Sequence, residues 1–245
     1  GIEDGVISNI YAARMDRDSF MEEIREKYGL TQAQMDTISV YEDGFDLDYL
    51  LGGRGSRYRG CCALEGGLMD LGPDPVPREP LDTRYNVHHG DRADGVFKYF
   101  ITGDRNWKLI GHDYRRPDEK LLEMLTEASK RYDIRPDFDD FIGHGGRMIL
   151  FTSWNDMSIS PWQIAARYGD WVKKYGQSCV DDFVRFYVMP AATHCSGIRM
   201  DYLDWLDRWC TKGEYPSGTL YGFVEAVGGE MPMARFPGWV KYRGG

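Results

Sequence analysis

Residues 145–156 read Gly-Gly-Arg-Met-Ile-Leu-Phe-Thr-Ser-Trp-Asn-Asp, and this stretch decides the fold. The run from Arg147 to Thr152 is short and largely apolar and follows a Gly-Gly pair, which predicts a buried strand that runs out into a loop. Asp156 is therefore expected at a strand tip. Beyond it, Ser160-Pro161 supplies a hydroxyl cap and a first-turn proline, which predict the start of a helix. The apolar face of that helix is formed by Trp162, Ala165, Ala166, Trp171 and Val172.

A second apolar run, from Phe183 to Met189, predicts another buried strand, and it leads into His194. An acid and a histidine thus follow successive strands, with a helix between them. Sheets in α/β folds carry their functional side chains at the carboxyl ends of strands, and α/β-hydrolases place the acid before the histidine in this order. Asp156 and His194 are candidates for a catalytic pair. The alternative is that Asp156 caps the helix begun at Ser160 and that His194 is an ordinary loop histidine, and these two residues alone do not decide.

The surrounding sequence favours the catalytic interpretation. Residues 145–161, 180–190 and 194–195, together with the closing stretch 234–244, resemble the tannase and feruloyl esterase family. The resemblance implies an α/β fold, namely the C-terminal strands and helices of an α/β-hydrolase core with a large inserted lid domain. By this resemblance residues 1–137 are the C-terminal part of the lid, and residues 138–245 are the part of the core that carries the catalytic acid and histidine.

The same resemblance assigns roles to individual residues. Asp156 matches the family's catalytic acid and His194 its histidine, while Cys195 matches a cysteine that forms a disulfide with a cysteine beside the nucleophilic serine. The implied function is hydrolysis of a carboxylic ester of an aromatic or phenolic acid, such as a gallate or ferulate. Two alternatives remain: a catalytically silent binding protein of the same fold, and a hydrolase of other ester or amide substrates.

The nucleophile is not visible in these 245 residues, since no serine lies in a G-x-S-x-G elbow upstream of Asp156. Ser56 has the wrong glycine spacing, and no strand leads into Cys61-Cys62. We therefore expect the serine and its neighbouring cysteine on a preceding N-terminal part of the same protein, absent from this chain. That part would be the main partner, held through Cys195.

Composition narrows the class of partner and the compartment. A net charge of −9 and the lack of a basic stripe argue against nucleic acid as a partner. The sequence contains no apolar run of about 18 residues, so no membrane span is predicted. The chain has five cysteines, an odd number, so at least one cannot form a disulfide within the chain, as expected if Cys195 pairs outside it. The other four allow three pairings, and we expect disulfides among them, which favours a secreted or periplasmic protein. These four are Cys61, Cys62, Cys179 and Cys210.

The first residues point to calcium. The stretch Gly1 to Asn9 resembles the second half of a calcium loop in the family's lid domain. By that resemblance Asp4 contributes a carboxylate, and Ile2 and Val6 contribute backbone carbonyls, which are the hard oxygen ligands that calcium prefers. Taken alone, Asp4-Gly5 is typical of a simple turn. No organic cofactor is expected.

An aromatic stretch lies between Gly95 and Trp107. The family has a similar phrase in its lid, above the catalytic cleft, where aromatic rings would stack on a planar acyl group. Phe97, Phe100 and Trp107 are therefore candidate substrate-binding residues. For most of the stretch, packing within the lid is the expected role.

Helical periodicity is present elsewhere in the chain. The remaining predicted helices cover residues 16–28, 31–44 and 117–132, and a last helix begins at residue 202 and ends at Lys212-Gly213. Residues 43–86 are predicted to be irregular.

Overall fold

The computed structural model describes residues 6–50, 56–67, 88–134, 137–192, 194, 198–225 and 227–241. The chain forms two compact units. The first, here called the sheet unit, comprises Gly1–Gly44, Arg59–Leu68 and Asp137–Gly245, and the second unit comprises Phe45–Tyr58 and Met69–Pro136. The division into a lid of residues 1–137 and a core of 138–245 stays a prediction. The compact units differ from it because the first 44 residues group with the sheet.

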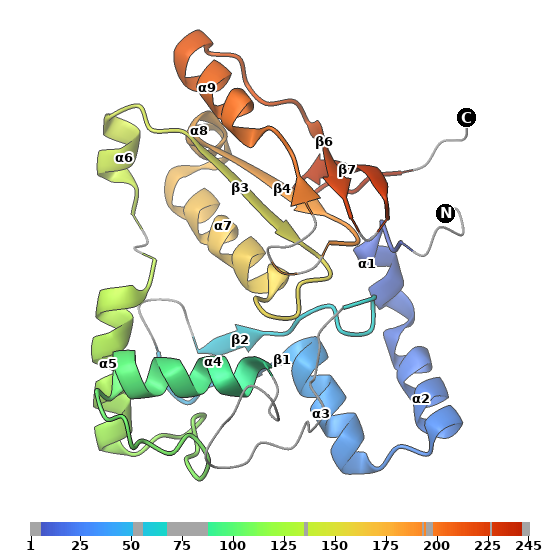
Figure 1. Cartoon of the computed structure of the whole chain (residues 1–245), viewed down its shortest axis with the longest axis vertical. Helices are drawn as coiled ribbons and strands as arrows, with labels where there is room; N and C mark the ends of the chain where they lie inside the picture. Colours follow the sequence, from blue (N-terminus) through green and yellow to red (C-terminus); the bar gives the residue numbers. More distant parts are fainter. Residues whose placement is uncertain are drawn as a thin grey trace. The chain divides into compact units, whose positions relative to one another are not determined.

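The helices and strands of the sheet unit are drawn in Figure 1. Its helices are α1 (Ile10–Ala13), the 3-10 helix η1 (Arg14–Asp16), α2 (Arg17–Tyr28), α3 (Gln32–Asp43), α6 (Asp139–Gly143), α7 (Pro161–Tyr175), α8 (Gln177–Phe183) and α9 (Tyr202–Lys212). Its strands are β3 (Met148–Ser153), β4 (Val184–Met189), β5 (Ile198–Arg199), β6 (Thr219–Val224) and β7 (Gly229–Arg235).

The second unit is mainly helical in its described part. It contains α4 (His88–Val96), the π-helix η2 (Phe97–Ile101) and α5 (Glu119–Tyr132). Two short strands, β1 (Gly44–Asp46) and β2 (Arg57–Arg59), pair with each other at the sequence positions where the chain passes between the units.

The sheet has the order β3-β4-β7-β6-β5. Only β3 and β4 run parallel, in a register that sets Met148 opposite Val184 and Ser153 opposite Met189, and the other pairs are antiparallel. Helices α7 and α8 make the connection between the two parallel strands (Figure 1). The carboxyl ends of β3 and β4 therefore meet at the same edge of the sheet, as the sequence predicts.

The predicted helix boundaries follow local capping chemistry. Ser160 Oγ accepts a hydrogen bond from the Gln163 amide at 3.1 Å, and Pro161 is the first residue of α7, so this helix begins where the sequence predicts. Helix α3 begins with a capping box in which Thr31 and Gln34 bind each other's backbone amides. Helices α2 and α9 end at glycines with left-handed φ values of 63° and 70°.

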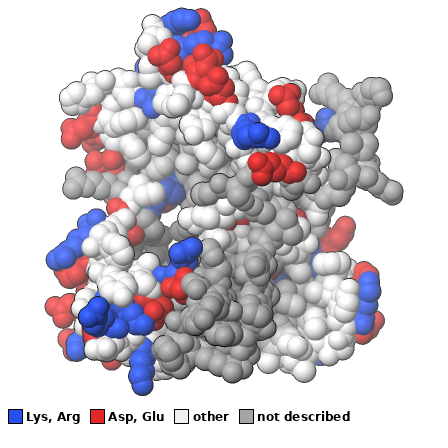
Figure 2. All heavy atoms as spheres, viewed as in Figure 1, with Lys and Arg blue, Asp and Glu red and all other residues white. Residues whose placement is uncertain are grey.

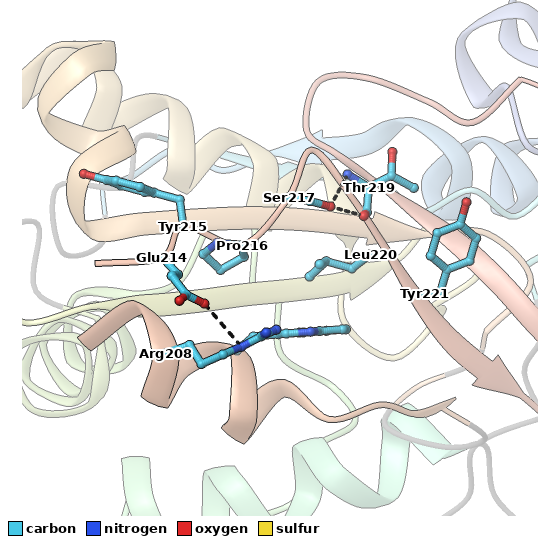
Figure 3. Close-up of a pocket in the computed structure, with 9 residues that line it drawn as sticks. Arg208, Glu214, Tyr215, Pro216, Ser217, Thr219, Leu220 and Tyr221 are labelled. Atoms are coloured by element: carbon cyan, nitrogen blue, oxygen red, sulfur yellow. Dashed lines mark hydrogen bonds and ion pairs between the residues drawn. The ribbon is translucent and has the colours of Figure 1, made fainter. Parts of the chain in front are cut away.

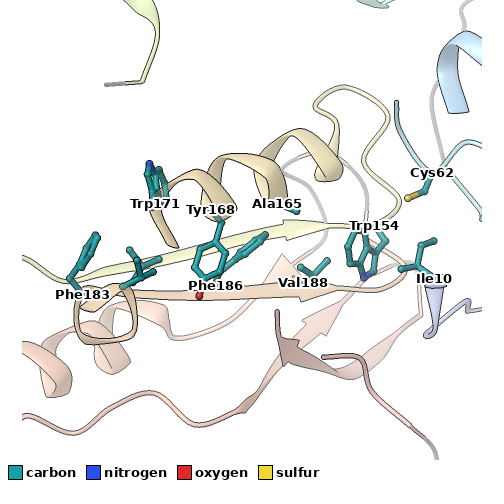
Figure 4. Packing of buried hydrophobic residues seen from close by; sticks show 11 residues of the cluster. Ile10, Cys62, Trp154, Ala165, Tyr168, Trp171, Phe183, Phe186 and Val188 are labelled. Carbon is teal, nitrogen blue, oxygen red and sulfur yellow. The ribbon is translucent and has the colours of Figure 1, made fainter. Parts of the chain in front are cut away.

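Strand β4 is buried on both faces, which explains its continuous apolar sequence. Phe186 and Val188 on one face pack beneath α7 with Trp154 and Tyr168 (Figure 4). On the opposite face lies a second cluster formed by Tyr187, Met189, Ala192, Leu220, Val224 and Met233. Five of the six residues of the strand that precedes His194 are therefore buried.

The expected disulfides among four cysteines are wrong, because Cys61, Cys62, Cys179 and Cys210 are all thiols in the structure. Their environments explain this. Cys62 is fully buried in the core beside α7, whereas Cys210 is exposed on α9. Burial raises the pKa of the Cys62 thiol, with a further contribution from the Glu65 carboxylate, so this residue is a poor nucleophile.

Charges of both signs intermingle over the described residues on the face shown in Figure 2, which bears no continuous basic stripe. Among the helices that the structure describes, none combines the length and apolarity that crossing a membrane requires.

Candidate active site

Asp156 and His194 lie in direct contact. Asp156 Oδ2 is 2.9 Å from His194 Nδ1, although 38 residues separate them in the sequence. The Asp156 side chain is 9% exposed and that of His194 is 37% exposed, so the acid is shielded while the ring reaches the surface. The predicted meeting of two strand tips thus brings the two residues together in hydrogen-bonding geometry.

The second carboxylate oxygen of Asp156 is occupied by its own loop. Oδ1 accepts hydrogen bonds from the amides of Ser158 at 2.8 Å and Ile159 at 3.0 Å. Because Ser160 caps α7, Asp156 does not cap that helix; it closes the turn before it. These two bonds fix the carboxylate and aim Oδ2 at the histidine.

The two strand tips are also tied to each other. Trp154 donates its amide to the Met189 carbonyl at 3.1 Å, and Ser153 Oγ donates to the Ala192 carbonyl. Asn155 Oδ1 accepts from the Ala191 amide at 2.7 Å. Sequence reasoning did not single out Ser153 or Asn155. Their only local signal is that short polar side chains at a strand end commonly bind backbone groups.

One cavity of about 360 Å³ is lined by both members of the pair. Most of its other lining residues are apolar, and they are Phe151, Ile159, Ile164, Ile198, Met200 and Tyr202. Thr152 and Ser153 complete the lining. Since Ser153 Oγ donates its hydrogen to a backbone carbonyl, this serine has a structural role rather than that of a nucleophile.

The pair can act as a general base. With Nδ1–H donated to Asp156, Nε2 is the ring nitrogen that can take a proton, and the carboxylate stabilises the imidazolium that results. This tautomer is assigned from the hydrogen bond to Asp156.

A buried ionic cluster lies in the same unit. Glu42 is fully buried, Glu65 is 4% exposed, and Arg14 contacts both, with Nη1 2.8 Å from Glu42 Oε1 and 3.8 Å from Glu65 Oε1. Burial and the adjacent Glu42 carboxylate raise the pKa of Glu65 to about 7, against the opposing effect of Arg14. The two carboxyl groups share one cation, so a proton on Glu65 removes their repulsion.

Phe97, Phe100 and Trp107 lie in the second unit, and their contact with substrate stays a prediction. Phe97 packs on Tyr114 with ring centroids 4.7 Å apart, and Trp107 stacks on His112 at 4.4 Å. These two aromatic residues thus pack within their own unit. Phe100 is 56% exposed and lines an apolar cavity of about 370 Å³ in that unit.

Several predicted site residues lie outside the described part of the chain. These are Ile2 and Asp4 of the calcium loop and Cys195 of the disulfide. Val6 is described and partly buried. Within the described ranges, no group of three or more metal-binding side chains occurs.

A further cavity of about 470 Å³ lies between α9 and the start of β6 (Figure 3). It is lined by Trp205, Arg208, Glu214, Tyr215, Pro216, Ser217, Thr219, Leu220 and Tyr221. Arg208 Nε lies 3.9 Å from Glu214 Oε2 and 3.2 Å from Asp204 Oδ2, so its charge is balanced locally. None of the predicted site residues lines this cavity.

The chain is similar to known proteins in sequence and in structure. An uncharacterized esterase of Agrobacterium fabrum is 30% identical over 262 residues, which cover 100% of this chain and 47% of that protein. The chain therefore spans about half the length of the curated relative it matches.

Solved structures with the same fold include an esterase from Aspergillus oryzae, with a TM-score of 0.63 at 18% identity, covering 98% of this chain and 49% of that one. Feruloyl esterase B from Aspergillus oryzae has a TM-score of 0.61 at 16% sequence identity, and the match covers 85% of this chain and 42% of that one. Tannin acyl hydrolase from Aspergillus niger has a TM-score of 0.57 at 16% sequence identity, and the match covers 84% of this chain and 40% of that one. These likenesses show that the mixed sheet and its helices belong to an α/β-hydrolase fold.

The family profile described as tannase and feruloyl esterase matches residues 1–245, the whole chain. With the strand-tip Asp156–His194 pair in place on an α/β-hydrolase sheet, the chain belongs to the tannase and feruloyl esterase family.

Proposed function

We propose that Asp156 and His194 are the acid and base of a serine carboxylic ester hydrolase that acts on esters of aromatic or phenolic acids. The observation that carries the proposal is the 2.9 Å contact between Asp156 Oδ2 and His194 Nδ1 beside a largely apolar cavity. The relatives named as esterases support ester hydrolysis, and the neighbours named as feruloyl esterase and tannin acyl hydrolase support an aromatic acyl group.

In the proposed mechanism a serine outside this chain attacks the ester carbonyl carbon while His194 Nε2 takes the hydroxyl proton. The resulting tetrahedral oxyanion collapses, and the imidazolium returns the proton to the leaving alcohol. Water then attacks the acyl-enzyme with His194 again as base, which releases the acid and restores the serine. Throughout, Asp156 holds the ring in one tautomer and stabilises its charged form.

A panel of esters tests the proposal. The full-length protein should cleave methyl ferulate and methyl gallate faster than methyl butyrate or an anilide of ferulic acid, and His194→Ala should abolish cleavage. A preference for the aliphatic ester or the anilide would contradict the aromatic assignment. If the protein cleaves none of the four compounds, the result would favour the alternative of a catalytically silent binding protein.

The nucleophile is proposed to lie on a preceding part of the protein, joined to this chain by a disulfide from Cys195. Such a bond would persist in a secreted or periplasmic protein, which is the location we propose. Peptide mapping of the full-length protein without reductant should find the Cys195 peptide linked to a peptide outside residues 1–245. A freely alkylated Cys195 would contradict this part of the proposal.

Calcium is proposed as a structural ion. The donor set of Asp4 with the carbonyls of Ile2 and Val6 offers hard oxygen ligands, and the support for it is the sequence of residues 1–9.

A further inference from the structure

The side chain of Asn155 joins three segments of the sheet unit. Its Nδ2 donates to the Gly66 carbonyl at 2.6 Å and to the Glu65 carbonyl at 3.4 Å, and its Oδ1 accepts from the Ala191 amide at 2.7 Å. The residue is 7% exposed. One planar amide therefore connects the tip of β3, the tip of β4 and residues 65–66, which are about 90 residues away in the sequence.

Both ends of this connection reach a member of the catalytic pair. Asn155 directly precedes Asp156, and Ala191 lies three residues before His194. Ala191 has a φ of 60°, a left-handed conformation that alanine rarely adopts. The hydrogen bond from its amide to Asn155 holds the backbone in this conformation. The backbone of Ala191, three residues before His194, is therefore held by the asparagine.

The third segment is a fixed anchor. The Gly60 carbonyl accepts from Ser160 Oγ at 2.5 Å, and the Cys61 amide donates to the Tyr41 carbonyl at 2.7 Å. The Leu64 amide donates to Glu42 Oε2 at 3.2 Å, within the buried ionic cluster. Residues 60–67 thus bind α3 on one side and the loop of Asp156 on the other, and they form what we call the brace.

Only an amide satisfies all of these groups. Asparagine supplies two N–H donors and one carbonyl acceptor, whereas a carboxylate supplies acceptors alone and an aliphatic side chain supplies neither. Replacing it leaves the Gly66 carbonyl and the Ala191 amide without this partner at partly buried positions, which favours rearrangement of both loops.

We propose that Asn155 is the positioning residue of the pair, and that it sets the Asp156–His194 distance by locking both loops to the brace. This inference rests on the proposed function for its kinetic consequence, but its geometric consequence is independent of substrate.

Two readouts in the full-length protein test the inference. The first is the downfield proton resonance of the His194 Nδ1–H group, assigned by its loss in His194→Ala. In Asn155→Ala we expect this resonance to broaden or move upfield. The second is ester hydrolysis, where we expect kcat to fall about 10- to 100-fold with KM nearly unchanged, because the pair is misplaced while the cavity remains.

Thr31→Ala is the matched control. Thr31 Oγ1 caps α3 by accepting from the Gln34 amide at 3.4 Å, in the same unit and at an exposed position. It should lower stability without changing the His194 resonance or kcat. An Asn155→Ala variant with the wild-type resonance and kcat would overturn the inference. If the wild-type protein cleaves no ester, the proposed function fails, and the resonance alone decides the role of Asn155.

Discussion

At the scale of single residues, Asp156 uses its two carboxylate oxygens for different tasks. Oδ1 binds the amides of Ser158 and Ile159, and Oδ2 faces His194 Nδ1. The sequence offered capping and catalysis as competing interpretations. The structure combines a local turn with the contact to histidine, because each oxygen has its own partners.

This division of labour predicts the effect of Asp156→Asn. The remaining oxygen can still close the turn, so the fold should persist, but the new NH₂ group faces a ring nitrogen that must donate, and the histidine adopts the wrong tautomer. We expect kcat to fall by about 10⁴-fold with little change in KM. Steady-state kinetics of the full-length protein measures both.

Asp170→Asn is the matched control, since Asp170 lies on the surface of α7 with a side chain that is 57% exposed. It should retain wild-type kinetics. Equal turnover in Asp156→Asn and Asp170→Asn would show that the acid has no catalytic role.

Glu65 makes stability depend on pH. The unfolded chain loses this proton near pH 4.5, whereas the folded chain keeps it until about pH 7. The stabilisation from the proton is therefore fully present below pH 4.5 and is lost as the pH rises to about 7. We expect a loss on the order of 3 kcal/mol, measured by urea unfolding across this range.

In Glu65→Gln the side chain stays neutral at every pH, so the free energy of unfolding should change less between pH 4.5 and 7 than in the wild type. Glu22→Gln, on the exposed surface of α2, should keep the pH dependence of the wild type. Parallel pH profiles for Glu65→Gln and the wild type would rule out Glu65 as the titrating group.

At the scale of elements, Ser160 connects α7 to the brace. Its Oγ accepts from the Gln163 amide and donates to the Gly60 carbonyl, and the residue is 1% exposed. Thr31 caps α3 in the same way, but from an exposed position. The two caps therefore differ in burial and in the additional bond that Ser160 makes.

Ser160→Ala should lower the free energy of unfolding by about 2 kcal/mol, because it removes a cap and leaves a buried carbonyl without this donor. Thr31→Ala should cost only about 1 kcal/mol. Urea unfolding of both variants, with unchanged m-values, gives the comparison. A smaller effect for Ser160→Ala than for Thr31→Ala would contradict the role assigned to the brace.

The elements that sequence predicts well are those with local signals. Strands β3 and β4 are largely apolar runs, and Ser160-Pro161 marks the start of α7 in the sequence. Strands β6 and β7 were missed. In β6, buried Leu220 alternates with exposed Thr219 and Tyr221, a usable signal, but β7 contains Pro232 and becomes a strand through pairing with β4 and β6.

At the scale of the whole molecule, the candidate site divides into predictable and unpredictable parts. Asp156 and His194 could be found because each follows its own apolar strand. The brace could not, because its contacts with Asn155 join positions about 90 residues apart without any periodic pattern. The buried Glu42 and Glu65 likewise look like surface charges until Arg14 is placed beside them.

Calcium removal acts at this scale, because an ion bound only by the folded state stabilises it by mass action. We expect chelation with EGTA to lower Tm, calcium to restore it, and Asp4→Asn to abolish the response. Asp18→Asn, which changes an exposed carboxylate on α2, should respond as the wild type does. An equal response to calcium in Asp4→Asn would place the ion elsewhere.

The central claim is that Asp156 and His194 activate a serine supplied from outside this chain. Labelling of the full-length protein with a fluorophosphonate, followed by peptide mapping, tests it most directly, because this reagent modifies a serine activated by a neighbouring base. We predict one labelled serine outside residues 1–245, with labelling lost in His194→Ala. Labelling of a serine within residues 1–245, or labelling that persists in His194→Ala, would contradict the claim.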